Sequence, residues 1–209
     1  MFSKFRKPAA VLLVITLVLM MMPVQADTIE TADLLGTITG ETYENSFLGI
    51  GCRLEGWHYY TDEEIEETNQ ITMENLAAEI RKLASENIAV MVAETADSLQ
   101  NVNIQLRNVA QYTSVYNEVG LVSIAQSSLD QFKESLEASG MNDVDTHLDS
   151  VNISGEDIPG IGGSYTLSSY PIYFMQLWIL RGDFLVYLTA TTILEDQTEE
   201  VLSHFYLLP

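Results

Sequence analysis

Residues 170–192 are the densest apolar run after the N-terminus, and the run is interrupted only at Arg181, Gly182 and Asp183. A Gly-Asp pair between two apolar segments is typical of a two-residue hairpin loop. With Gly182 and Asp183 in that loop, Arg181 pairs with Phe184, and this pairing fixes the register of both strands. The segment therefore predicts a β-hairpin.

This register also predicts what each face of the hairpin carries, because side chains alternate between the two faces of a strand. One face is wholly apolar and consists of Met175, Leu177, Ile179, Val186, Leu188 and Ala190. The other mixes apolar and polar groups and consists of Phe174, Gln176, Trp178, Leu180, Leu185, Tyr187, Thr189 and Thr191. Since both faces can be covered, we expect the hairpin near the middle of a sheet.

The rest of the chain alternates between strand-like and helix-like patterns. Strands are predicted at residues 39–43, 47–54, 88–94, 101–109, 144–153 and 164–168, with loops at residues 44–46 and 154–163. Helices are predicted at residues 61–69, 73–84, 119–139 and 195–205, the first beginning with a Thr-x-x-Glu capping box. The buried stripe of the 119–139 helix is predicted to contain Val122, Ala125, Leu129, Phe132 and Leu136. This order predicts an α+β fold, a single domain over residues 37–209 with a mostly antiparallel sheet and helices packed on its faces.

The N-terminus has the pattern of a secretory signal peptide over residues 1–26. Lys4, Arg6 and Lys7 precede an apolar run, and Ala26 ends a Val-Gln-Ala cleavage motif. The apolar run is shorter than the about 20 residues that a membrane-spanning helix needs, so we expect cleavage rather than an anchor. We predict a mature chain from Asp27, a flexible leader over residues 27–36, and a secreted or extracytoplasmic location in the cell envelope, with no stable membrane anchor.

The chain is strongly acidic, with 9 basic and 30 acidic residues and a formal net charge of −21. Residues 1–26 hold three of the basic residues and none of the acidic ones, so the mature chain has six against 30, a net charge of −24. Repulsion between like charges argues against nucleic acid and anionic membranes as partners. Solubility is the plainer explanation of the acidity, and a surface that binds cations or a basic partner is the alternative.

The sequence carries no recognisable motif for catalysis, for a cofactor or for a metal. The histidines His58, His147 and His204 are scattered and lack zinc-site spacing. The run from Asp143 to Asp149 resembles the start of a calcium loop, but the required glycine and closing glutamate are missing. We therefore interpret these aspartates as a solvated strand face and predict no catalytic residue, metal or cofactor.

The single cysteine, Cys52, lies in an alternating apolar run with Leu48, Ile50 and Leu54. A reactive thiol needs exposure and a positive neighbourhood, and this pattern offers neither. We predict a buried, unreactive thiol in a strand.

The sequence Tyr-Glu-Asn-Ser-Phe at residues 43–47, followed by a strand and by Glu55-Gly56-Trp57, resembles the opening hairpin of the PsbP-like family. The order of elements from residue 37 to the end is also similar to that family, which includes Ran-binding Mog-type proteins and exported bacterial proteins of unknown role. The chain departs from the family by lacking a proline before Glu55. The resemblance implies a PsbP-like fold and a module that binds proteins or assists assemblies without catalysis, and it transfers no functional residue.

The mixed face of the central hairpin is the predicted binding site, because polar groups near a sheet centre need hydrogen-bond partners that a ligand could supply. The candidate residues are Trp57, Tyr59, Gln176, Trp178, Tyr187 and Thr189, the first two from an aromatic cluster that could line a carbohydrate or partner site. A second helical layer over this face is the plainer alternative. We expect an exported, non-enzymatic binding or assembly module with a protein as its partner. A hydrolase with a motif-free Ser/His/Asp site and an acidic cation-binding surface protein are the alternatives.

Overall fold

The computed structural model describes residues 31–82 and 86–209. The predicted signal peptide and residues 27–30 of the predicted leader lie outside these ranges. The large sheet has the spatial order β4-β5-β6-β10-β9-β8-β7, and a smaller sheet has the order β1-β2-β3-β11. All neighbouring strands are antiparallel, which confirms the predicted α+β fold with its mostly antiparallel sheet.

The strands and helices have the following residue ranges. The large sheet contains β4 His58–Tyr59, β5 Ile88–Glu94, β6 Gln100–Asn108, β7 Asn142–Ile153, β8 Glu156–Leu167, β9 Tyr170–Arg181 and β10 Phe184–Ile193. The small sheet contains β1 Thr37–Thr39, β2 Thr42–Asn45, β3 Ile50–Arg53 and β11 Phe205–Leu207. The helices are α1 Thr31–Leu35, α2 Asp62–Asn69, α3 Met73–Lys82, α4 Thr113–Val119, α5 Leu121–Ala138 and α6 Thr198–Leu202.

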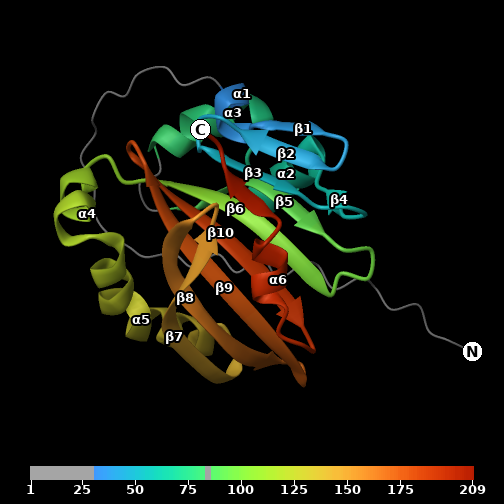
Figure 1. Ribbon diagram of the computed structural model, residues 1–209, viewed down its shortest axis with the longest axis vertical. Coiled ribbons are helices and arrows are strands. Elements are labelled where there is room, and N and C mark those ends of the chain that lie inside the picture. Colours follow the sequence, from blue (N-terminus) through green and yellow to red (C-terminus); the bar gives the residue numbers. More distant parts are fainter. Residues whose placement is uncertain (1–30, 83–85) are drawn as a thin grey trace, which may run out of the picture.

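The central hairpin has the predicted register throughout. Arg181 pairs with Phe184 and Trp178 with Tyr187, and Gly182 has the positive φ of 54° that such a loop requires. β9 and β10 have two or more strands on either side, so the hairpin lies in the interior of the sheet, as predicted (Figure 1).

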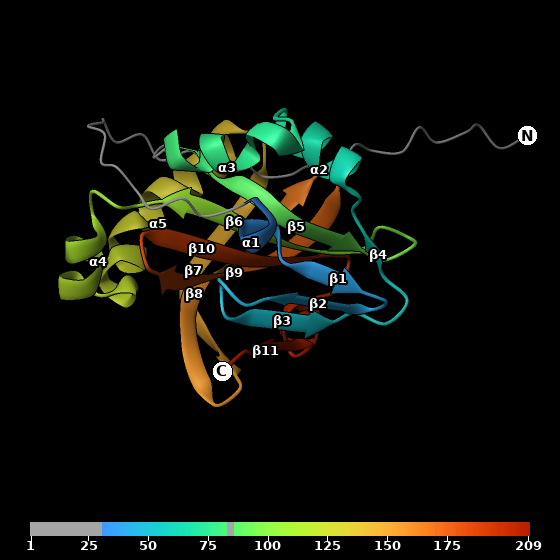
Figure 2. The same ribbon diagram turned by 90° about the horizontal axis from the view of Figure 1, so that it is seen from above.

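The two faces of the large sheet have different covers (Figure 2). The apolar face of the hairpin, with Leu177 and Leu188 fully buried, joins one core cluster with the inner side of the small sheet. The mixed face packs against α5, whose Phe132 stacks on Phe174 with ring centroids 5.5 Å apart. Stacking a second sheet on one face and a helix on the other buries the hairpin from both sides.

The small sheet is only partly predicted by the sequence. The predicted first turn is displaced, because β2 continues to Asn45 and the turn occupies residues 46–49. The end of the predicted terminal helix is wrong: α6 stops at Leu202, and Phe205 starts β11, which pairs with β3.

The predicted glycine-rich loop at residues 154–163 is also wrong, since only a turn at Ser154 and Gly155 separates β7 from β8. Strand β8 carries Gly160 and Gly163 because a Cβ there would collide with the carbonyl oxygens of Gln176 and Asp145 respectively. These glycines therefore serve close packing of backbones.

The helix predicted at residues 119–139 is observed as α5, and Gly120, with a φ of 81°, separates it from the shorter helix α4. Ala125, Phe132 and Leu136 are buried as predicted, whereas Val122 is 58% exposed. The predicted stripe is therefore wrong at Val122, which lies in the first turn of α5.

The described part of the predicted flexible leader is ordered. Residues 31–35 form α1, Leu34 is fully buried, and its carbonyl accepts a hydrogen bond of 2.8 Å from the Asn45 side chain. Residues 31–35 therefore form a short helix, which packs against the small sheet and α3, and the prediction of a flexible leader is wrong for them.

Candidate functional site

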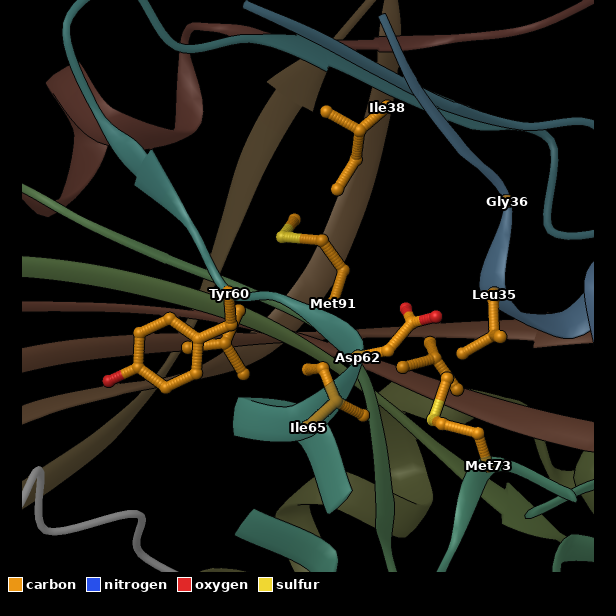
Figure 3. Close-up of a pocket in the computed structure, with 10 residues that line it drawn as sticks. Leu35, Gly36, Ile38, Tyr60, Asp62, Ile65, Met73 and Met91 are labelled. Carbon is orange, nitrogen blue, oxygen red and sulfur yellow. The ribbon is translucent and has the colours of Figure 1, made fainter. Parts of the chain in front are cut away.

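A cavity of about 330 Å³ opens at the edge of the large sheet, between β5, the start of α2 and the connection from α1 to β1 (Figure 3). It is lined by Leu35, Gly36, Ile38, Tyr60, Asp62, Ile65, Met73, Val90, Met91 and Val92. Most of these residues are apolar, and Asp62 is the one with an ionisable carboxylate. The volume of the cavity lies at the lower end of the range of about 300 to 1,000 Å³ that is usual for small-molecule sites.

The cavity exists because the edge of β5 is only partly covered. β4 pairs with β5 over two residues, and the last backbone bond of this pairing runs from the Tyr60 N–H to the Val92 carbonyl at 2.9 Å. Further along, the Asn69 side-chain amide bonds both backbone groups of Ala89, at 2.9 and 2.7 Å. Asn69 thus replaces a neighbouring strand for one residue.

A β-bulge lies between these two covered points. The pairing of β5 with β6 shifts register between Ala89 and Met91, and Val90, Met91 and Val92 all line the cavity. A bulge bends the edge of a strand and changes the direction of its side chains. The cavity therefore occupies the part of the edge where regular pairing stops.

Gly36 positions the opposite wall of the cavity. Its φ is 71°, and a Cβ there would lie 2.6 Å from the Glu44 carbonyl oxygen. Only glycine combines this conformation with such close packing. The turn at Gly36 places Leu35 on the inner side and leaves Ile38, which is 46% exposed, at the mouth.

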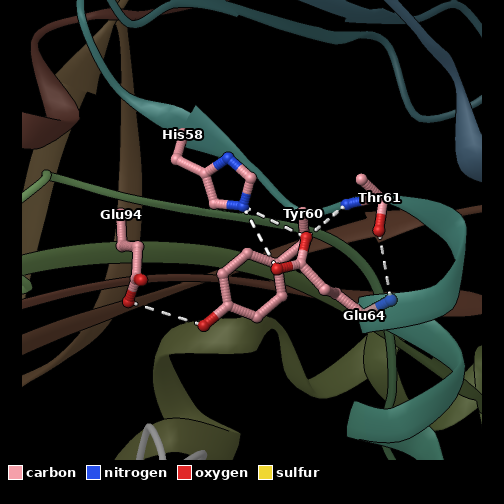
Figure 4. A network of polar contacts seen from close by, with 5 residues as sticks. All are labelled: His58, Tyr60, Thr61, Glu64 and Glu94. Carbon is pink, nitrogen blue, oxygen red and sulfur yellow. Dashed lines mark hydrogen bonds and ion pairs between the residues drawn. The ribbon is translucent and has the colours of Figure 1, made fainter. Parts of the chain in front are cut away.

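The turn from β4 into α2 is held by a polar network (Figure 4). Thr61 and Glu64 form the predicted capping box, with the Thr61 N–H donating to the Glu64 carboxylate at 2.8 Å. That backbone hydrogen bond is the main reason why the pKa of Glu64 is lowered. His58 Nε2 lies 3.1 Å from Glu64, and the Tyr60 hydroxyl donates to Glu94 at 3.5 Å. The network fixes the backbone on both sides of Asp62.

Four of the predicted site residues lie together on the mixed face, under α5. The Trp178 indole N–H donates to Gln176 Oε1 at 3.2 Å, and the Gln176 amide donates to Thr189 at 3.2 Å. Tyr187 packs edge-on against Trp178, with ring centroids 5.6 Å apart. Burial raises the pKa of Tyr187 to about 12. Gln176, Trp178 and Thr189 therefore bond one another without a ligand.

A second, much smaller cavity of about 70 Å³ borders this network and is lined in part by Gln176, Trp178 and Tyr187. One water molecule occupies about 30 Å³ in the liquid, so this space accommodates about two waters. It is too small for a ligand of ordinary size.

Trp57 and Tyr59, the other two predicted residues, do not join that group. Both pack against the core cluster on the opposite face of the large sheet. The Tyr59 hydroxyl donates to the Glu41 carbonyl at 3.1 Å and lies 3.6 Å from the Cys52 sulfur. The sequence linked the two groups by their aromatic character, but the sheet lies between them.

Cys52 is buried, as predicted, with no exposed surface. Burial raises the pKa of its thiol to about 11. The thiol therefore remains protonated at neutral pH, and its low reactivity remains a prediction.

The described residues give no geometric support for a metal site. No group of three or more histidine, cysteine, aspartate or glutamate side chains in this part of the chain is arranged to hold a metal ion. His147 lies 3.8 Å from both Asp145 and Asp149 on the exposed strand β7. Neither cavity is lined by a histidine or a cysteine.

Comparisons with known proteins add little to this geometry. No protein-family model and no curated protein matches the chain. A solved structure described as a protein of unknown function, PA94 from Pseudomonas aeruginosa, a putative regulator, matches with 15% sequence identity and a TM-score of 0.30. The match covers 50% of this chain and 62% of that chain. Similarity at this level carries no argument about function. Within the ranges 31–82 and 86–209, no helix is long and apolar enough to span a membrane.

The residues of the larger cavity are not among the candidate site residues predicted from the sequence. Ile38, Asp62 and Met91 come from three separate segments, and their neighbourhood arises only from tertiary packing. Asp62 lies in the first turn of the predicted helix, two residues after Tyr60, and its local pattern does not indicate a cavity.

Proposed function

We propose that this protein is an exported, non-enzymatic binding module whose ligand or partner group occupies the cavity at the edge of β5. The observation that carries the proposal is the cavity itself, about 330 Å³ of mainly apolar lining that remains open to solvent at Ile38. Burying an apolar group there removes both the group and the lining from water, at about 25 cal/mol per Å². The resemblance to the PsbP-like family supports the non-enzymatic part of the proposal.

The edge cavity is a better binding site than the mixed face that the sequence favoured. The predicted site residues Gln176, Trp178 and Thr189 of the mixed face already bond one another, and a ligand that reached them would have to displace bonds such as that from Trp178 to Gln176. At the edge, a ligand meets apolar side chains and displaces only water. The larger volume and the smaller loss of existing hydrogen bonds both favour the cavity at the edge of β5 as the binding site.

A titration of the mature chain with 1-hexanol, followed by amide NMR shifts, tests the proposal. We expect saturable shifts at residues 60–65 and 90–92 and much smaller shifts at residues 176–187. Ile38→Trp places a large ring at the mouth and should weaken binding, while the matched variant Val122→Trp, at another exposed apolar residue, should leave it unchanged. Shifts confined to residues 176–187, or no saturable shift, would overturn the proposal.

A further inference from the structure

We propose that the edge cavity selects an alkylammonium group, an apolar chain that ends in a cation, and that Asp62 is the residue that recognises the cation. This inference rests on the proposed function, because it names the class of ligand for the same cavity. It derives from the contrast between the apolar lining and its one carboxylate.

The Asp62 carboxylate is available for a ligand. It is the first residue of α2 and projects toward the cavity lined by Leu35, Met73 and Met91 (Figure 3). Among the described residues, no hydrogen bond or ion pair engages it, whereas two neighbouring carboxylates have structural partners. Glu64 accepts from Thr61, and Glu66 accepts from the Met73 backbone at 2.6 Å.

The electrostatic surroundings favour a cation over an anion. No lysine, arginine or histidine lines the cavity, and Asp62 is the one carboxylate in its lining. The net charge of −24 expected for the mature chain acts in the same direction over longer distances. A ligand carboxylate or phosphate would be repelled.

The positions of the apolar walls and of the Asp62 carboxylate determine the shape of a ligand that fits the cavity. Ile65, Met73 and Val90 form apolar walls, and Asp62 is an exposed residue at the boundary with solvent. An alkyl chain can therefore lie against the walls while its ammonium group stays partly hydrated beside Asp62. A free alkylamine and the lysine side chain of a protein both carry this chemistry.

Three probes of equal chain length test the selection: hexylammonium, 1-hexanol and hexanoate. An exposed ion pair gives about 0.2 to 1 kcal/mol, so hexylammonium should bind the mature chain up to about fivefold more tightly than 1-hexanol. Hexanoate should bind most weakly. High salt should reduce the preference for the cation, because it screens exposed charges.

Asp62→Asn should abolish the preference for hexylammonium, which is measured as the ratio of the hexylammonium and 1-hexanol dissociation constants on the same variant. Glu63→Gln removes an equal charge from the adjacent position, which does not line the cavity, and should preserve most of the preference. The inference is overturned if wild-type protein binds hexylammonium no better than 1-hexanol, or if Asp62→Asn keeps the preference. Failure of all three probes to bind would instead overturn the proposed function.

A second pair of probes distinguishes the source of the cation. N-acetyl-lysine amide and N-acetyl-norleucine amide differ in the ammonium group but share a peptide backbone. A preference for the lysine derivative that disappears in Asp62→Asn supports a protein partner. If only the free amine shows such a preference, the same chemistry is supported with a small amine as ligand.

Discussion

The cavity at the edge of β5 and the smaller cavity under α5 solve opposite packing problems. Under α5, the side chains of Gln176, Trp178 and Thr189 hydrogen-bond one another beside a cavity of about 70 Å³. At the edge of β5, mainly apolar side chains surround about 330 Å³ that stays open. Buried polar groups require partners, and these three find them in one another, whereas apolar walls at an edge can remain unfilled. The difference teaches that a polar sheet face is a poor indicator of a binding site when its groups can bond one another.

The largest expected effect concerns the packing that supports both cavities. Leu188 has no exposed surface and lies on the face of the large sheet that packs against the small sheet. Leu188→Ala should lower the free energy of unfolding by about 2 to 5 kcal/mol through the cavity that it leaves. Urea denaturation measures this. Leu194→Ala, at a 48% exposed leucine, is the control and should cost far less. A loss below about 1 kcal/mol for Leu188→Ala would show that the two sheets pack loosely.

Gln176→Ala tests whether the interior network is closed. The substitution leaves the Trp178 indole N–H and the Thr189 hydroxyl without their partner, which should cost about 1 to 3 kcal/mol. Thermal unfolding should show a clear decrease in Tm, whereas Gln126→Ala on the exposed side of α5 should show almost none. An unchanged Tm for Gln176→Ala would mean that this face is an open site, and the comparison between the cavities would fail.

Thr61→Ala tests the support of the edge cavity. It removes the side-chain half of the capping box that begins α2, and such a loss typically costs about 1 kcal/mol. Tyr60 and Asp62, on either side, should also become more mobile, so 1-hexanol should bind more weakly. Thr61→Ser keeps the hydroxyl and should restore both stability and binding. Equal behaviour of the two variants would show that the cap does not position the cavity wall.

The smallest expected effect is a dependence of stability on pH. The pKa of Glu64 is lower in the folded chain than in the unfolded chain, mainly because Thr61 N–H donates to its carboxylate. The folded state thus binds fewer protons at this group, and its contribution is complete above the unfolded pKa. It is lost as the pH falls through the lower folded pKa. The Glu64 side chain is 41% exposed, and screening by solvent keeps the loss small.

Glu64→Gln isolates this contribution, because glutamine can still accept from Thr61 but cannot titrate in the acid range. The difference in stability between wild type and Glu64→Gln, measured by urea denaturation at successive pH values, should change as the pH falls below the ordinary range of a glutamate. A difference that is independent of pH would contradict the role of this hydrogen bond.

Local patterns in the sequence determined the parts of the fold that depend on near neighbours. The Gly182-Asp183 pair fixed the register of β9 with β10, and Thr61 with Glu64 fixed the start of α2. The alternation around Cys52 predicted its burial correctly. In each case the physical cause, a turn, a cap or a two-residue period, acts over a few residues.

Only the tertiary structure decided the contacts between distant segments. Phe205 belongs to a strand because Cys52 offers a partner across the small sheet, and Gly160 lies in a strand because the Gln176 backbone approaches it. The edge cavity likewise depends on Ile38, Asp62 and Met91 meeting across separate elements. A buried polar side chain needs a ligand only if the folded chain gives it no hydrogen-bond partner. Neither the residue type nor the alternation pattern along a strand specifies those partners.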